Sequence, residues 1–393
     1  MFMFEKAIVG GRRYWIWVLA LLAVMAAGFL AYLSQLEHGL GITGMSRDVT
    51  WGLYIAQFTF LVGIAASAVM VMLPYYLHDY KAFGKLTILG EFLAIAAVSA
   101  AMLFVFVDLG QPARILNVLL YPSFGSMMFW DLVALGGYLL INATIALVTL
   151  GAEQKGATPP AWIRPVILVS IPWAVSIHTV TAFLYNGLPG RSFWLTAILA
   201  PRFLASAFAS GPALLILLCI AMRRLTRFDV GKESLQKLAV IVAYAMVLNI
   251  FFILMEVFTA FYSGIPEHVS HFEYLFAGLS GHAALVPWMW VSMMLAVVSV
   301  VILIIPRARR NERILAWTSA GVFLSLWIDK GIGLIVGGFV PSPLEAVTDY
   351  APTAPEIAIA LGIWATGVLM VTVFYKIVLS VRDSAAGGAG QPV

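Results

Sequence analysis

Long apolar stretches, each about 20 residues or more, recur ten times along this chain, and short segments rich in Gly and Pro separate them. A helix of about 20 residues crosses the roughly 30 Å hydrocarbon core of a bilayer and satisfies its own backbone hydrogen bonds there. We therefore predict an all-α integral membrane protein with ten transmembrane helices. The predicted spans cover residues 13–35, 51–76, 86–107, 127–150, 164–186, 195–222, 236–262, 284–305, 314–338 and 356–380.

The composition excludes several other classes of protein. Hydrophobic residues make up 62% of the 393 residues and charged residues 11%, a balance that no soluble domain of this length could keep dispersed. The sequence has no Walker A motif, no dinucleotide-binding glycine fingerprint and no HExxH motif, so phosphate-driven transport and soluble-cofactor chemistry have no support. The single cysteine, Cys219, can hold neither an iron–sulfur cluster nor an internal disulfide.

Basic residues indicate the orientation of the chain in the membrane. Of the 23 Lys and Arg residues, 18 fall at the two termini and in the even-numbered turns, so the positive-inside rule places both termini in the cytoplasm. They are spread over short turns and form no single patch, which argues against nucleic-acid binding. The N-terminal apolar run lacks a clear signal cleavage site, so we interpret it as a retained helix. The outward loops are longer than most inward ones, which favours a partner on the outer face.

Spans two to five and six to nine resemble each other. Because four spans make up each copy, the copies would have the same orientation, as two parallel-related four-helix bundles with peripheral first and last helices. Chance recurrence of common apolar residues is the alternative. Two sets of four residues share one offset: Trp51, Phe60, Leu61 and Ser67 in the first copy, and Trp194, Phe203, Leu204 and Ser210 in the second. His178 matches Lys330 at a similar offset.

This duplication divides the chain into four predicted parts. Residues 1–50 form an N-terminal peripheral helix and a periplasmic loop, and residues 51–190 form the first bundle. Residues 191–340 form the second bundle, and residues 341–393 form a periplasmic loop, the last helix and a cytoplasmic tail.

Seven of the ionisable side chains inside the predicted spans are of particular interest. A charge in hydrocarbon costs a few kcal/mol or more, so such residues usually line a cavity, a pathway or a ligand site. Only Glu91 lies toward the cytoplasmic face, and the other six lie toward the outer face. These six are Asp131, His178, Arg202, Glu256, Asp329 and Lys330. Their common level predicts a polar site near the outer face.

Three acidic or imidazole groups in the first copy are candidates for proton chemistry. Asp108 closes the third span, and it either pairs with Arg114 across the turn as a cap or takes part in a site. Asp131 lies about one turn into its span beside Trp130. Either the helix dipole alone stabilises an acid at this position, or the carboxylate accepts protons from a quinol.

His178 is flanked at helical spacing by Ser176 and Thr179, and it can either hold helices together or hydrogen-bond a quinone carbonyl. The other five histidines lie in turns or near span ends, so we expect no haem, which usually needs a buried histidine pair.

Arg202, Glu256, Asp329 and Lys330 belong to the second copy. Neighbouring residues on a helix point about 100° apart, so Asp329 and Lys330 each need a partner elsewhere, with Glu256 or Arg202 as candidates. A structural ion-pair network and a proton-handling role, which Glu91 would share, both remain open.

Three motifs resemble the NrfD/PsrC family of quinone-interacting membrane subunits: residues 51–67, the turn at residues 108–114, and Phe129-Trp130-Asp131. Residues 41–47, 171–194 and 327–343 look closest to the DsrP members of that family. The resemblance runs across essentially the whole chain. It implies a quinone site near the periplasmic face at the first bundle, with Tyr54, Asp108, Arg114, Trp130 and Asp131 at matching positions.

The resemblance also implies partners and a location. The chain would be a subunit without metal in a menaquinol-dependent oxidoreductase complex of sulfur metabolism, such as the DsrMKJOP complex, in the inner membrane of a bacterium or archaeon. Its partners would be a periplasmic ferredoxin-like iron–sulfur subunit (DsrO-like), a multihaem cytochrome c (DsrJ-like), and membrane and cytoplasmic subunits (DsrM- and DsrK-like). Menaquinone would be the bound substrate.

These observations lead to one leading hypothesis. Tyr54, Trp130 and His178 position a quinone head group, Asp131 or Asp108 takes its protons, and electrons pass to a partner on the outer face. The alternative is a secondary transporter or ion-translocating protein that uses the same buried charges.

Overall fold

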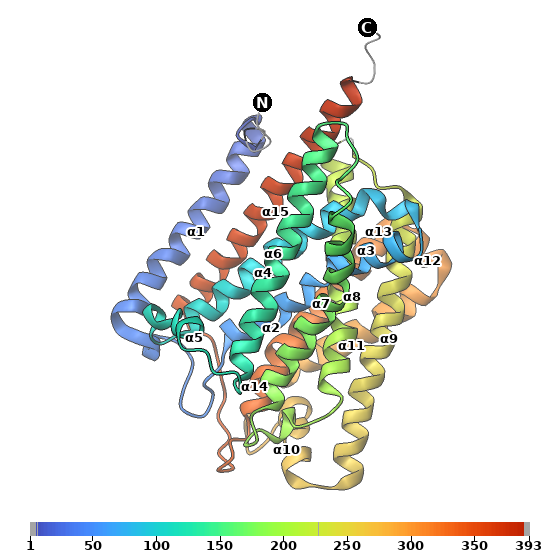
Figure 1. Cartoon of the computed structure of the whole chain (residues 1–393). Coiled ribbons are helices and arrows are strands. Elements are labelled where there is room, and N and C mark those ends of the chain that lie inside the picture. The colour runs from blue at the N-terminus through green and yellow to red at the C-terminus, as the bar shows by residue number, and fades with distance from the viewer. Residues whose placement is uncertain (1–4, 6, 227, 389–393) are drawn as a thin grey trace.

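The structure is a computed structural model, which describes residue 5 and residues 7–226 and 228–388 (Figure 1). Over these residues it consists of helices and connecting loops without strands, and ten helical segments are long and apolar enough to cross a membrane. The expectation of an all-α, multi-pass integral membrane protein with ten spans is therefore confirmed.

The ten spans are as follows, in chain order. They are α1 (Arg12–His38) with η2 (Gly39–Ile42), α2 (Leu53–Ala65) with α3 (Ser67–Leu77), η3 (Lys81–Phe83) with α4 (Gly84–Asp108), α6 (Met127–Gln154), α7 (Ile163–Asn186), α8 (Leu199–Leu225), α9 (Lys232–Ser263), α11 (Val286–Ile304), α13 (Glu312–Leu326) continued by η6 (Trp327–Gly333) and α14 (Leu334–Phe339), and α15 (Ala354–Gly388). Short helices lie between them: η4 (Pro112–Arg114), α5 (Asn117–Leu120), η5 (Ser192–Trp194), α10 (Pro266–Phe276) and α12 (Pro306–Arg310).

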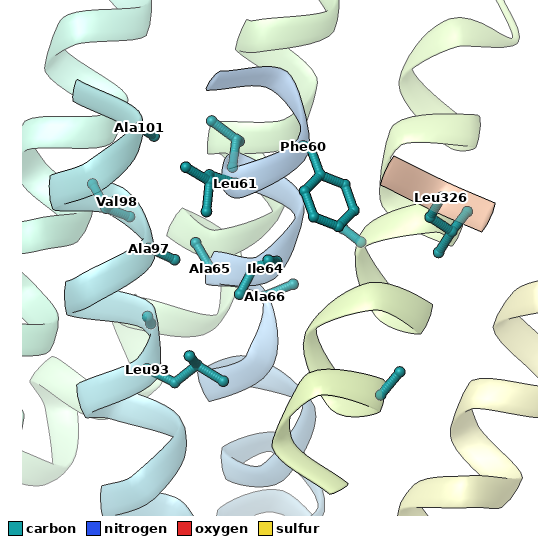
Figure 2. Close-up of a cluster of buried hydrophobic side chains, with 14 of the residues drawn as sticks. Phe60, Leu61, Ile64, Ala65, Ala66, Leu93, Ala97, Val98, Ala101 and Leu326 are labelled. Atoms are coloured by element: carbon teal, nitrogen blue, oxygen red, sulfur yellow. The ribbon is translucent and has the colours of Figure 1, made fainter. Parts of the chain in front are cut away.

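Helices α2 and α3 form the most buried span. Every residue of α2 is buried, which fits a helix that is apolar on all its faces. Small residues of α4 let it approach α2 closely: Figure 2 shows Ala97 and Ala101 of α4 beside Leu61 and Ala65 of α2. Close approach of small residues is the usual way in which membrane helices associate, because lipid offers no hydrophobic driving force.

The first and last spans, α1 and α15, pack against each other along one side of the molecule (Figure 1). A Cβ atom added at Gly28 of α1 would lie 2.8 Å from the backbone carbonyl oxygen of Ala358 and from Cα of Gly362 on α15. The two helices therefore cross at glycines because no side chain fits between their backbones. Helix α15 also packs on α4 and α6, so this pair flanks the first predicted bundle.

The two copies of the predicted duplication meet through matching residues. The indoles of Trp51 and Trp194 stack with ring centroids 5.9 Å apart. A Cβ at Gly211, next to Ser210, would lie 2.7 Å from the backbone nitrogen of Ser67. Helices α2 and α8 pack together along this contact. The division at residues 190 and 191 into two related bundles stays a prediction.

The N-terminal end of α1 and the C-terminal end of α15 lie at the same end of the helix assembly, at the top of Figure 1. An even number of spans requires this arrangement. Two of the basic residues used for the topology prediction, Lys6 and Arg227, lie outside the described residues. The cytoplasmic orientation of this end stays a prediction.

Candidate functional site

A groove of about 480 Å³ lies where the C-terminal ends of α1 and α4 meet. Ligand pockets usually have a volume of about 300–1,000 Å³, apolar walls and a few polar groups. This groove has a volume within that range, mostly apolar lining residues and a few polar side chains. Its lining residues are Tyr32, Gln35, Leu36, Gly39, Leu40, Phe106, Leu109, Gly110, Gln111, Pro112 and Ala113.

A buried chain of hydrogen bonds fixes one wall of the groove. The Tyr54 hydroxyl donates to Oε1 of Gln35 at 2.7 Å, and Nε2 of Gln35 donates to the backbone oxygen of Val107 at 2.7 Å. Tyr54 is fully buried and Gln35 nearly so. The three helices α1, α2 and α4 are thereby held together at the level of the groove.

Two polar atoms beside the groove have no hydrogen-bond partner among the described residues. One is the hydroxyl of Tyr32, whose ring packs on Phe106, and the other is Oδ1 of Asp108. Asp108 directly precedes the lining residues that begin at Leu109. Buried polar groups are nearly always hydrogen-bonded, so these two atoms are available to bond to a ligand or to water in the groove.

Of the two alternatives for Asp108, the ion pair with Arg114 is absent among the described residues. Arg114 lies in η4 with its side chain exposed, and no ion pair joins it to Asp108 in the described part of the chain. The turn that contains Gly110 and Pro112 separates the two side chains, since Asp108 ends α4 and faces the helices. Arg114 instead lies on the surface beside the groove.

A second group of polar residues connects α6 and α7. Asp131 is buried, and its Oδ1 accepts a hydrogen bond of 2.6 Å from the Thr181 hydroxyl. One turn farther out on α7, the Tyr185 hydroxyl bonds to Thr59 of α2.

His178 faces the same side of α7 as Thr181 and Tyr185. It is fully buried, and neither ring nitrogen has a hydrogen-bond partner among the described residues. Its predicted neighbours do not share this face: the hydroxyls of Ser176 and Thr179 bond to carbonyls of their own helix.

Trp130 lies apart from the other candidates. Its indole is 41% exposed, packs on Phe124 and Phe129, and donates a hydrogen bond of 2.8 Å from Nε1 to the backbone oxygen of Phe124. It therefore anchors the loop before α6 at the surface. The structure links Tyr54 through Gln35 to Val107, the residue before Asp108, and links Asp131 to Thr181 on the face of α7 that carries His178, but it leaves Trp130 and Arg114 outside both groups.

The second copy contains a buried ion triad. The Arg202 guanidinium donates from one nitrogen to Glu256 at 2.6 Å, and from the other to both oxygens of Asp329 at 2.8 and 3.0 Å. All three side chains are nearly buried. A planar guanidinium suits such bonding because its donors form a rigid fork. The prediction that Asp329 finds its partner in Arg202 is consistent with this geometry.

Lys330 has no carboxylate partner in the described residues. Its ammonium lies over the ring of Phe203 at 4.4 Å and donates to the backbone oxygen of that residue at 3.3 Å. It lies close to α2, because a Cβ at Gly63 would be 3.1 Å from Nζ. Asp329 and Lys330 both belong to η6, a π-helical segment. Such segments are rare and often mark functional sites.

Glu91 lies alone in the inner half of α4. It is fully buried, and neither carboxylate oxygen has a hydrogen-bond partner in the described part of the chain. On α6, which packs on α4, the backbone oxygen of Tyr138 accepts a hydrogen bond from Nδ2 of Asn142 at 2.7 Å. Oδ1 of Asn142 is also unpaired among the described residues. These groups could bind water, which buried unpaired polar atoms usually do.

Sequence reasoning missed Gln35, Tyr32 and Glu356. Glu356 is fully buried and accepts from the backbone nitrogens of Gly44 at 2.9 Å and Leu53 at 3.2 Å, and from the Tyr350 hydroxyl. Burial, together with the Glu356 charge, raises the pKa of Tyr350. A glutamine inside the first apolar stretch was the available signal for Gln35. Glu356 sits at a predicted helix start, where an acid is common.

Within the described residues, no three or more His, Cys, Asp and Glu side chains gather in a way that could hold a metal ion.

Comparisons with known proteins agree on one family. Residues 41–340 match the family described as Polysulphide reductase, NrfD. The chain is 28% identical to a putative dimethyl sulfoxide reductase membrane subunit of Halobacterium salinarum, over 91% of this chain and 89% of that relative. It is 26% identical to the Hdr-like menaquinol oxidoreductase integral membrane subunit of Archaeoglobus fulgidus, over 64% and 62%. It is 21% identical to the menaquinone reductase integral membrane subunit of Nitratidesulfovibrio vulgaris, over 93% and 91%.

Proposed function

The chain belongs to the NrfD family, and from this premise we propose that it exchanges electrons between menaquinone or menaquinol and an iron–sulfur partner protein. In this proposal the chain is the quinone-binding membrane subunit of a redox complex. Two relatives named for menaquinol or menaquinone chemistry support it. The observation that carries it is the groove at the C-terminal ends of α1 and α4, with its two unpaired polar atoms.

The groove suits a quinone head group. Tyr32 and Phe106 offer aromatic faces, and the Tyr32 hydroxyl is free to donate to a carbonyl oxygen. When bound, a quinone supplies a redox couple that takes up or releases two electrons and two protons. Tyr54 does not line the groove, but it holds Gln35 in place and so positions the wall.

Asp108 is the proposed proton acceptor. Its unpaired Oδ1 lies at the end of α4 beside the groove, so it can take a proton from a quinol hydroxyl and pass it to the outer face. His178, Thr181 and Tyr185 share one face of α7, and Thr181 bonds to Asp131, so these side chains would extend the polar path along that helix. Asp131 and His178 would then hold or relay protons, and the electrons would leave through the partner. Trp130 and Arg114, exposed at the surface, would contact the tail of the quinone or the partner.

For the second copy we propose a structural role for the triad of Arg202, Glu256 and Asp329, whose charges already satisfy one another. Lys330 and Glu91 remain candidates for proton handling, because neither has an oppositely charged partner among the described residues. A cytoplasmic membrane with both termini inside, and DsrO-, DsrJ-, DsrM- and DsrK-like partners, are part of the same proposal.

The test uses menaquinol oxidation by the purified complex. Asp108→Asn should lower turnover at least about 100-fold, since a positioned acid or base typically contributes 10²–10⁴-fold. Binding of a quinone analogue should stay within a few-fold of wild type. Tyr32→Phe should weaken analogue binding. The matched control is Glu37→Gln, which removes an exposed carboxylate near the same end of α1.

Full turnover in Asp108→Asn would exclude that residue as the acceptor. Unchanged analogue binding in both Tyr32→Phe and a Leu36→Trp variant, which fills the groove, would exclude the groove as the quinone site. The comparisons do not favour the alternative of a secondary transporter, because the matched family and the named relatives are reductase or oxidoreductase subunits.

A further inference from the structure

A second groove, of about 370 Å³, lies at the opposite end of the molecule between α8 and α13. Neither the quinone chemistry nor the buried charges involve it. Its lining residues are Leu217, Arg224, Arg313, Ala316, Trp317 and Ala320. Two arginines, one tryptophan and an apolar floor are an unusual combination for a surface groove in a chain with so few charges.

The lining residues are ordered by depth. On α13, Arg313, Ala316, Trp317 and Ala320 follow one another at helical spacing and so share a face. On α8, Leu217 and Arg224 lie two turns apart on one face. Seven residues of helix span about 10 Å, so both arginines lie at the helix ends and the apolar floor lies about 10 Å deeper.

The charges at the mouth of the groove are not all neutralised. Arg223 forms an ion pair with Glu312 and a longer one, of 3.8 Å, with Asp229. By contrast, Arg224 and Arg313 have exposed side chains and no ion-pair partner in the part of the chain that the structure describes. Glu312 is the acid nearest in sequence to Arg313, and Arg223 already compensates its charge.

Trp317 lies near the start of its candidate membrane span, Glu312–Phe339. It is 79% exposed and lies one turn below Arg313 on the same face. Tryptophan favours the interface between water and hydrocarbon, with its ring at the level of the lipid head groups. The arginines therefore lie at the level of the phosphates, and Ala316, Ala320 and Leu217 lie at the level of the acyl chains.

We propose that this groove binds an anionic phospholipid. Arg224 and Arg313 would hold its phosphate, Trp317 would pack beside the glycerol backbone, and one acyl chain would lie on the floor formed by Leu217, Ala316 and Ala320. Free phosphate would use the same arginines but would leave the apolar floor uncovered, which is why we assign a lipid.

Native mass spectrometry of the delipidated full-length chain in detergent tests this assignment. Phosphatidylglycerol should bind, and phosphatidylcholine should bind at least tenfold more weakly. A juxtamembrane basic residue adds about 1 kcal/mol to the attraction of an anionic lipid, so Arg224→Gln with Arg313→Gln should weaken phosphatidylglycerol binding about thirtyfold. The matched control is Arg307→Gln with Arg310→Gln, which removes the same charge from α12, outside the groove.

A third variant tests the floor. Ala320→Trp keeps both arginines but fills the groove, and it should also weaken lipid binding. Equal phosphatidylglycerol affinity in the wild type and in the Arg224/Arg313 variant would overturn the proposal, as would equal binding of phosphatidylcholine. Displacement of the lipid by millimolar inorganic phosphate would reassign the arginines to a free anion. Loss of the lipid whenever partner subunits are bound would show that a protein covers this face instead.

Discussion

Replacing Arg202 by Met should destabilise the protein strongly, because it removes the cation from the buried triad. Arg202 bonds to Glu256 at 2.6 Å and to Asp329 at 2.8 and 3.0 Å, with side chains between 8% and 11% exposed. Met replaces the aliphatic part of the Arg side chain but carries no charge, so both carboxylates would be left buried without a partner. Breaking a buried ion pair in this way typically costs about 3–5 kcal/mol.

The magnitude follows from burial and not from the number of contacts. Exposed ion pairs contribute only about 0–1 kcal/mol, because water solvates the separated charges equally well. The free energy of unfolding can be measured by reversible titration with a denaturing detergent, followed by tryptophan fluorescence. The control is Arg310→Met, which removes an exposed arginine.

A compensating variant separates charge from packing. Adding Glu256→Gln and Asp329→Asn to Arg202→Met removes the uncompensated charges, so it should recover more than half of the lost stability. If this triple variant also keeps menaquinol oxidation, the triad is structural, as we propose. A loss of less than 1 kcal/mol in Arg202→Met, or no recovery in the triple variant, would refute the reasoning.

Two further predictions concern the helix contacts around the sites. Gly28→Leu should separate α1 from α15, because its Cβ would lie 2.8 Å from the backbone of Gly362. The free energy of unfolding should fall by about 1–3 kcal/mol. The affinity for a quinone analogue should also fall, because α1 lines the groove. His271 is buried in α10 with Nδ1 within 2.8 Å of the backbone oxygens of Gly337 and Val340, and burial lowers its pKa below 6.5. As pH falls below about 6.5, the unfolded chain binds a proton that folded His271 resists, so stability should decrease, by at most about 1.4 kcal/mol per pH unit. His271→Gln should reduce this slope in unfolding measurements between pH 7.5 and 5.5.

Each of these predictions has a matched control. Gly136→Leu adds the same side chain at a helical glycine with open space around it, so it should leave stability and analogue binding nearly unchanged. His268→Gln changes a histidine on the same short helix that has no such carbonyl contacts. Equal effects in Gly28→Leu and Gly136→Leu would contradict the close-packing argument. An unchanged pH slope in His271→Gln would contradict the titration argument.

Much of the fold could be predicted from the sequence because membrane insertion depends on local properties. Each span is recognised from its own run of apolar residues, and the predicted spans agree with the ten observed segments to within a few residues at most boundaries. Interruptions inside spans were missed. The break at Ala66 and the π-helix over Trp327–Gly333 leave no pattern in hydropathy.

The candidate site was only partly predictable. Intramembrane charges are visible in sequence because they are rare, and Asp131 and His178 were found in this way, whereas Asp108 was found in the turn that ends the third span. Their partners were not visible. The expected partner of Asp108, Arg114, lies on the surface, whereas Tyr54 is held by Gln35, which is 19 residues away in the chain and on another helix.

The sequence by itself determined that this chain crosses the membrane ten times and that charged side chains lie inside the spans at a few depths. Both properties can be predicted because hydropathy and charge belong to each segment alone. The tertiary structure decided which of those charges neutralise one another, as in the triad of Arg202, Glu256 and Asp329, and which polar atoms stay unpaired beside a groove, as at Asp108. Pairing depends on distances between helices that are far apart in the chain. Packing of whole helices sets those distances, and no single segment encodes them.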